Sequence, residues 1–137
     1  PAIVFYPRRH IGFQGDNVVF QIMAEEVYDL AATEFTITFS PSDLQVNSVT
    51  PGSGFSDLGD VIFISDIDNT NGSITVSTAV WGDNSPSLSG TSHIAIIDVQ
   101  IIKQGTHQLD FDGSQVYRDP NNSEIIIQSA VNGLITQ

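Results

Sequence analysis

Apolar and polar residues alternate along this chain with the period of β-strands. From Thr33 to Phe39 the alternation is strict. Phe35, Ile37 and Phe39 therefore share one face of the segment, and polar side chains occupy the other. The segment Ser73–Val80 alternates in the same way. The pattern predicts strands with one buried and one exposed face.

Two further segments, Asn17–Ala24 and Ile94–Ile102, are richer in apolar residues, as strands buried on both faces are. Ile125–Ile127 and Gly133–Thr136 bracket a strand region near the C-terminus. Turn-forming residues separate the segments at Gly15–Asn17, Pro51–Gly54, Asn69–Gly72, Gly82–Pro86, Gln104–Thr106 and Asp119–Asn122. About nine short strands predict an all-β fold, an antiparallel β-sandwich with jelly-roll topology. A single helical turn is expected at Ser40–Leu44.

Neither a repeat nor a change in composition divides the chain, so we expect one domain over residues 1–137. Apolar residues make up 40% of the chain and charged residues 15%, which excludes a disordered segment. No apolar run approaches the roughly 20 residues that span a bilayer. The chain opens directly on Pro1–Tyr6 without a signal peptide, as an excised module would. From composition we expect an extracellular or cell-surface protein.

The charge balance is strongly acidic, with 16 Asp and Glu residues against four Lys and Arg residues and a net charge of -12. Nucleic acids and anionic membranes are therefore excluded as partners, because both require clusters of basic side chains. The chain contains no cysteine, which excludes disulfides and thiolate chemistry.

Signatures of enzyme chemistry are absent. His10, His93 and His107 are far apart, and none belongs to a metal-binding spacing. No nucleophile elbow, dinucleotide fingerprint or phosphate-binding loop occurs. We therefore expect a protein that is not an enzyme and needs no cofactor.

Two carboxylate pairs have a spacing that suits calcium. Asp66 and Asp68, and likewise Asp110 and Asp112, stand two residues apart, so each pair shares one side of a strand. The residues that follow do not supply the remaining ligands of a calcium loop. We therefore favour solvated acids in turns, with a calcium site as the alternative.

The single tryptophan, Trp81, follows Val80 in the alternation and should point away from the buried face. Two interpretations stay open: Trp81 anchors a protein contact, or it tucks under the loop Gly82–Ser92, which we favour slightly.

The order of the segments resembles that of cohesins, the receptor modules of cellulosomes and related surface assemblies. The resemblance covers nearly the whole chain and rests on segments that match the family's strand motifs: Gly15–Ile22, Ala32–Val46, Asn47–Gly52, Asn71–Val76, Ser89–Val99, Gly105–Thr106 and Val131–Thr136. It implies a binding module whose partner is a dockerin, a small module that carries calcium. It also implies that a flat sheet face contacts this partner through Glu34, Thr36, Thr38, Thr75, Ser77 and Ala79, with Asp66 and Asp110 nearby. Trp81 joins these candidate contacts because of its outward position in the alternation.

Three positions depart from the family pattern. Ala32 stands where well-studied cohesins have an asparagine, Glu34 replaces an aspartate, and Phe39–Pro41 replaces a Tyr-Asp-Pro tripeptide. These departures leave the fold intact but change the standard dockerin contacts, so another dockerin class or another protein partner fits as well.

Two other functions remain as alternatives. The apolar segment Ala2–Tyr6 could add a strand to the sheet of a second copy, which would make the chain a subunit of a surface fibre or layer. A carbohydrate-binding module ranks third, because Tyr6, Tyr28, Trp81 and Tyr117 show no alignment along one face.

Overall fold

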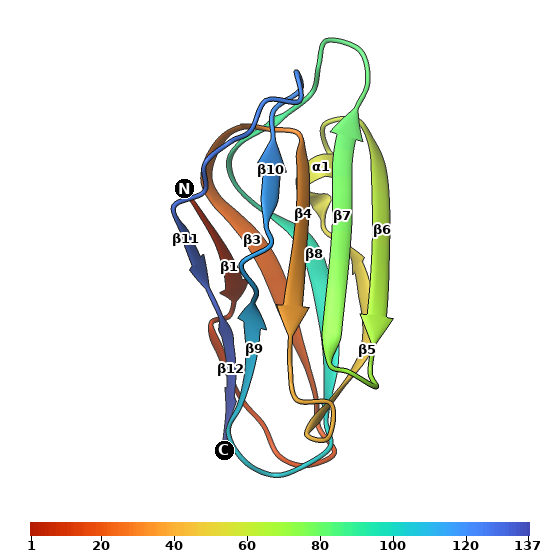
Figure 1. The fold of residues 1–137 in the computed structure, drawn as a ribbon, viewed down its shortest axis with the longest axis vertical. Helices are drawn as coiled ribbons and strands as arrows, with labels where there is room; N and C mark the ends of the chain where they lie inside the picture. Colours follow the sequence, from red (N-terminus) through yellow and green to blue (C-terminus); the bar gives the residue numbers. More distant parts are fainter.

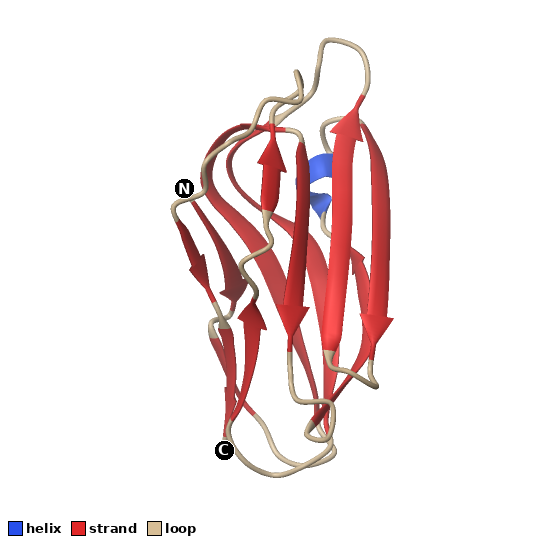
Figure 2. Cartoon of the chain, viewed as in Figure 1, coloured by secondary structure: helices blue, strands red, loops and turns tan.

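The computed structural model describes residues 1–137 and is a sandwich of two β-sheets with one short helix (Figure 1, Figure 2). Nine strands have four or more residues: β1 (Ala2–Tyr6), β3 (Asn17–Leu30), β4 (Ala32–Thr38), β5 (Leu44–Pro51), β6 (Asp60–Asp68), β7 (Ser73–Trp81), β8 (Leu88–Ile101), β9 (His107–Phe111) and β12 (Gly133–Thr136). Three strands have three residues each: β2 (Arg9–Ile11), β10 (Val116–Arg118) and β11 (Ser129–Val131). The predicted fold class is confirmed. The structure has twelve strands, where about nine were expected.

The first sheet has the order β11-β1-β3-β8-β5, and the second has the order β2-β12-β9-β4-β7-β6 with β10 beside β4. Most pairs are antiparallel, but β1 pairs with β11 and β2 pairs with β12 in parallel. The two ends of the chain run in the same direction from the first sheet into the second. The sheets are therefore mixed, with two short parallel pairs beside the antiparallel pairs that were predicted.

The core between the sheets is built from the inward-pointing residues of both layers. Phe5 and Phe20 of the first sheet meet edge to face, with ring centroids 5.2 Å apart. Phe111 of the second sheet contacts both Phe5 and Phe35. Each such buried aromatic or aliphatic side chain contributes about 1.5–3 kcal/mol to folding. Gly133 is required beside Phe5, because a Cβ there would lie 2.6 Å from the ring.

Strands β3 and β8 are longer than the alternation predicts. Their pairing continues beyond Ala24 through register shifts, with Glu26 and Asp29 at positive φ. The hydroxyls of Thr91 and Ser89 accept the backbone N–H groups of Glu26 and Asp29. The shifts interrupt the period of two, which is why the sequence pattern ends the strand too early.

Three local predictions have different outcomes. The turn at Ser40–Leu44 is confirmed, since the N–H of Leu44 donates to the carbonyl of Ser40. The helix α1 (Ser53–Ser56), which inserts the buried Phe55 into the core, was not predicted. Ile125–Ile127 is not a strand, and its one backbone bond into the sheet is Ile125 N–H to the carbonyl of Tyr117. No helix is long and apolar enough to cross a membrane.

Candidate functional site

The outward-pointing side chains of β10, β4, β7 and β6, together with Asp110 of β9, form one surface, here called the β4–β7 face. On β4, Thr33, Phe35 and Ile37 are buried, and the residues between them point outward. The same alternation holds along β7, with Ile74 and Val76 buried. Figure 1 shows these four strands side by side.

Strand register arranges the β4–β7 face in four rows that run across the strands. The first row contains Arg118, Ala32, Ala79 and Ile62, and the second contains Val116, Glu34, Ser77 and Ile64. The third contains Thr36, Thr75 and Asp66, and the fourth contains Asp110, Thr38, Ser73 and Asp68. Successive rows are about 7 Å apart along the strands.

All nine residues expected to contact a partner lie on or beside this face. Eight of them occupy the four rows: Glu34, Thr36, Thr38, Asp66, Thr75, Ser77, Ala79 and Asp110. The hydroxyls of Thr36 and Thr75 are 3.4 Å apart at its centre. Trp81 lies beyond the first row, opposite Asp60. Its side chain is 55% exposed, so the favoured interpretation, that it tucks under the following loop, is wrong.

The sequence did not identify the apolar part of this face. Ile62 and Ile64 are 51% and 63% exposed on β6, the edge strand of the second sheet. Val116 and Arg118 join the face through β10. A signal existed in the run Val61–Ile64, which is apolar at every position and so places apolar side chains on both sides of a strand. The run does not reveal that one side stays uncovered.

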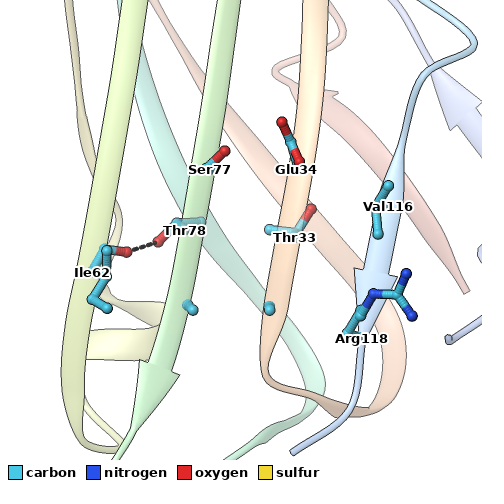
Figure 3. A pocket seen from close by; sticks show the side chains of 9 residues that line it. Thr33, Glu34, Ile62, Ser77, Thr78, Val116 and Arg118 are labelled. Atoms are coloured by element: carbon cyan, nitrogen blue, oxygen red, sulfur yellow. Dashed lines mark hydrogen bonds between the residues drawn. The ribbon is translucent and has the colours of Figure 1, made fainter. Parts of the chain in front are cut away.

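A shallow depression of about 230 Å³ lies in the first two rows of the face. Figure 3 shows Ile62 at one end of the depression and Val116 and Arg118 at the other, with Glu34 and Ser77 beside it. The hydroxyl of Thr78 donates to the carbonyl of Ile62 over 3.0 Å, which fastens β6 to β7 below the surface. The depression is mainly apolar, with Glu34 and Arg118 as its two charged groups.

The two carboxylate pairs do not come together. Asp68 and Asp110 lie at opposite ends of the fourth row, with Thr38 and Ser73 between them. No group of three or more His, Cys, Asp or Glu side chains is placed to hold a metal ion.

Hydrogen bonds support the interpretation of Asp68 and Asp112 as acids in turns. The Asp68 carboxylate accepts the N–H groups of Thr70 and Asn71 and the Asn71 side-chain amide. The Asn71 backbone bond, followed by its side-chain bond, lowers the pKa of Asp68 below its usual value. Asp112 accepts the N–H of Ser114. These bonds fix the two turns.

The histidines occupy separate structural positions. His10 bonds to the carbonyl of Val19, and His93 accepts the N–H of Ser53. His107 is buried beside Asp43, with Nδ1 and Oδ2 3.4 Å apart. No pair of them shares a site.

The sequence matches the family model described as "Cohesin domain" over residues 12–136. This chain belongs to the cohesin family. Cohesins are binding modules rather than enzymes. No curated protein matches the sequence.

Solved cohesins share the fold at low sequence identity. The cohesin CaCohA2 of Clostridium acetobutylicum, in complex with CaDoc0917(R16D), is 23% identical, with a TM-score of 0.82 over 98% of this chain and 97% of that chain. The third cohesin of ScaC from Acetivibrio cellulolyticus, in complex with the ScaB dockerin, is 19% identical, with a TM-score of 0.80 over 98% and 96%. A non-cellulosomal cohesin of the archaeon Archaeoglobus fulgidus is 17% identical, with a TM-score of 0.78 over 98% and 88%.

Proposed function

We propose that this cohesin domain binds a dockerin on its β4–β7 face and does so outside the cell. The domain contributes a preformed, flat sheet surface, and the partner contributes the calcium. The domain itself carries out no reaction.

One observation carries the proposal. In a member of a family of binding modules, exposed Ile64 continues the row of Ser77 and Glu34, and exposed Ile62 lies in the next row of the same face. Exposed apolar side chains with polar neighbours are typical of protein-binding surfaces. Several similar cohesins were solved as complexes with dockerins.

The alternative of a fibre subunit is weaker on this geometry. Strand β1 has β11 on one side and β3 on the other, so its backbone is already paired within the chain. Ile3 and Phe5 are buried in the domain's own core. The segment Ala2–Tyr6 is therefore not free to complete the sheet of another copy.

The carbohydrate-binding alternative is also weaker. Tyr6 and Tyr28 are exposed on strands of the first sheet, whereas Trp81 belongs to the second and Tyr117 is buried. These side chains cannot form the aligned strip that stacks on a flat polysaccharide. Burial raises the pKa of Tyr117, whose hydroxyl donates to Gln115 Oε1.

Membership of the cohesin family supports an extracellular setting more strongly than the composition of this chain does. A chain without cysteine and with a net charge of -12 fits an exported, soluble surface module. One similar structure is a non-cellulosomal cohesin, so an assembly other than a cellulosome also fits as the setting.

The test is affinity capture of the source organism's secreted proteins on the immobilised domain, in calcium and again in chelator. We expect proteins that carry dockerin modules to be retained in calcium and released by chelator. Thr36→Arg should weaken binding at least about 100-fold, because a long charged side chain at the centre of a flat face prevents close approach. Thr36 points outward, so the variant should keep the native unfolding temperature.

Thr50→Arg is the matched control, since Thr50 is exposed on β5 of the other sheet. It should bind as the unmodified domain does. Captured proteins without dockerin modules would contradict the proposed partner. Equal binding by the Thr36→Arg variant would contradict the proposed face.

A further inference from the structure

The β4–β7 face has two chemically different halves. The first and second rows hold its exposed apolar side chains, Ile62, Ile64 and Val116, around the depression. The third and fourth rows hold hydroxyl groups and the three carboxylates of Asp66, Asp68 and Asp110. The apolar half lies toward Trp81, and the acidic half lies toward the β6–β7 turn.

No basic side chain compensates the acidic half. The chain has four Lys and Arg residues, and Arg118 is the one that lies on this face, in the first row. The contact between His107 and the Asp43 carboxylate lies elsewhere. One carboxylate oxygen of Asp110 is buried without a hydrogen-bond donor. The negative charge of this half is therefore not neutralised by a basic side chain of the chain itself.

Ile62, at the outer end of the apolar half, lies well apart from the acidic half along β6. Ile62 and Asp66 are four residues apart on β6, which corresponds to about 14 Å along an extended strand. This distance exceeds the Debye length of about 8 Å at physiological ionic strength. A charge bound at Asp66 is therefore largely screened from Ile62, while the second row of the depression, about 7 Å away, still lies within this length.

A second copy of this chain is a poor occupant. Antiparallel pairing of two β6 edges centred on Ile64 would set Asp60 of each copy opposite Asp68 of the other. Like charges directly opposite in a sheet are destabilising. Each copy also carries a net charge of -12. The acidic ends of β6 thus act against self-association while its apolar middle stays exposed.

We propose that the partner presents an aliphatic side chain to the depression and Lys or Arg side chains about 14 Å away, to Asp66 and its acidic neighbours. This inference rests on the proposed function and specifies the chemistry of the dockerin surface. The apolar contact supplies most of the lifetime of the complex, because it is the part that excludes water. The acidic half accelerates association and fixes the orientation of the bound partner.

The experiment measures association and dissociation rates of the captured protein, produced in recombinant form, at about 20, 150 and 500 mM salt. Two variants separate the halves. Ile62→Ser should accelerate dissociation at least about tenfold at every salt concentration, because it removes an apolar anchor. Asp66→Lys should slow association about fivefold at low salt and have little effect at 500 mM, where the Debye length has fallen to a few ångströms.

Each variant has a control on the outer face of the first sheet. Val19→Ser removes an apolar side chain that is 46% exposed, and Glu25→Lys makes the same charge change on the same molecule. Both should leave the two rates within about twofold of the unmodified domain. Unfolding temperatures of all four variants identify any loss that is due to misfolding.

The outcomes separate this inference from the proposed function. If a captured dockerin associates as fast or faster with Asp66→Lys, or dissociates no faster from Ile62→Ser, the two-part face is wrong while dockerin binding stands. If a protein without a dockerin module shows both dependences, the inference stands and the proposed partner is wrong. If nothing is captured, both are wrong.

Discussion

The two sheets of this sandwich have similar sizes but differ in regularity. In the second sheet, β4 pairs with β7 and β7 pairs with β6 from end to end without a register shift. In the first sheet, the β3–β8 pairing shifts at three places, and the β5–β8 pairing shifts between Val46 and Ser48. The exposed apolar side chains of β6 belong to the regular sheet.

The difference explains why one outer face suits a partner better than the other. A register shift bends the strand and increases its local twist, so outward side chains no longer stand in rows. An unshifted sheet keeps its rows across several strands, and a rigid partner can contact all of them at once. In this domain, binding is thus proposed where the backbone is most regular.

Two glycines provide the strongest test of this comparison. Gly72 closes the β6–β7 turn at φ +82°, and a Cβ there would collide with the Phe39 carbonyl. Gly90 lies in the irregular part of β8 at φ +113°, with open space around it. Gly72→Ala should destabilise the fold by about 3 kcal/mol or more, since it adds a steric clash to an unfavourable dihedral angle.

Gly90→Ala should cost only the dihedral strain, about 1–2 kcal/mol. Urea unfolding of both variants measures the difference. Equal losses of stability would mean that the two glycine positions are under the same constraint and that regularity does not distinguish the sheets.

The regular sheet is also the part that the sequence predicts best. In β4 and β7 each residue's side follows from a strict period of two, so Thr36 and Thr75 could be assigned to one outer face without a structure. The positions of β6 and β10 could not be assigned, because exposure of Ile62 depends on its strand being at the edge. Sequence pattern describes a strand but not its neighbours.

In the irregular regions, assignment from the period of two fails for physical reasons. Glu26 and Asp29 adopt positive φ, so the alternation is lost while pairing continues. Ile125–Ile127 has the composition of a strand, but there the chain passes from the second sheet to the first and makes only one backbone bond. The sequence favoured a Trp81 side chain packed under the loop that follows it. Its exposure depends on the path of that loop, which the sequence pattern does not give.

A smaller effect is expected where the irregular sheet is tied to the regular one. Asn69 follows β6, and its side chain both accepts the N–H of Val46 and donates to the Val46 carbonyl, each over 2.9 Å. Val46 stands at the register shift of β5. Asn69→Ala should cost about 2 kcal/mol, because two partly buried backbone groups lose their partner.

Asn47→Ala is the control, since Asn47 also lies beside the shift but bonds only to exposed side chains. It should change the free energy of unfolding by less than about 0.5 kcal/mol. Chemical unfolding of both variants gives the comparison. A loss for Asn69→Ala no larger than that for Asn47→Ala would show that β5 is held by its pairing with β8 alone.

The smallest predicted effect concerns acid and the turn that closes the regular sheet. Hydrogen bonds from Asn71 and Thr70 hold the pKa of Asp68 below its ordinary value of 3.8. A carboxyl with a lowered folded-state pKa adds stability above its unfolded-state pKa, and this stability is lost as pH falls through the folded-state pKa. The Asp68→Asn variant should therefore unfold at a lower temperature than the unmodified domain at pH 7, and the gap should close below about pH 4.

Asp66→Asn is the control, because it removes a neighbouring charge without a turn bond, and it should show no such convergence. A gap for Asp68→Asn that stays constant from pH 7 to pH 3 would mean that the turn depends on side-chain shape rather than on the charge of Asp68.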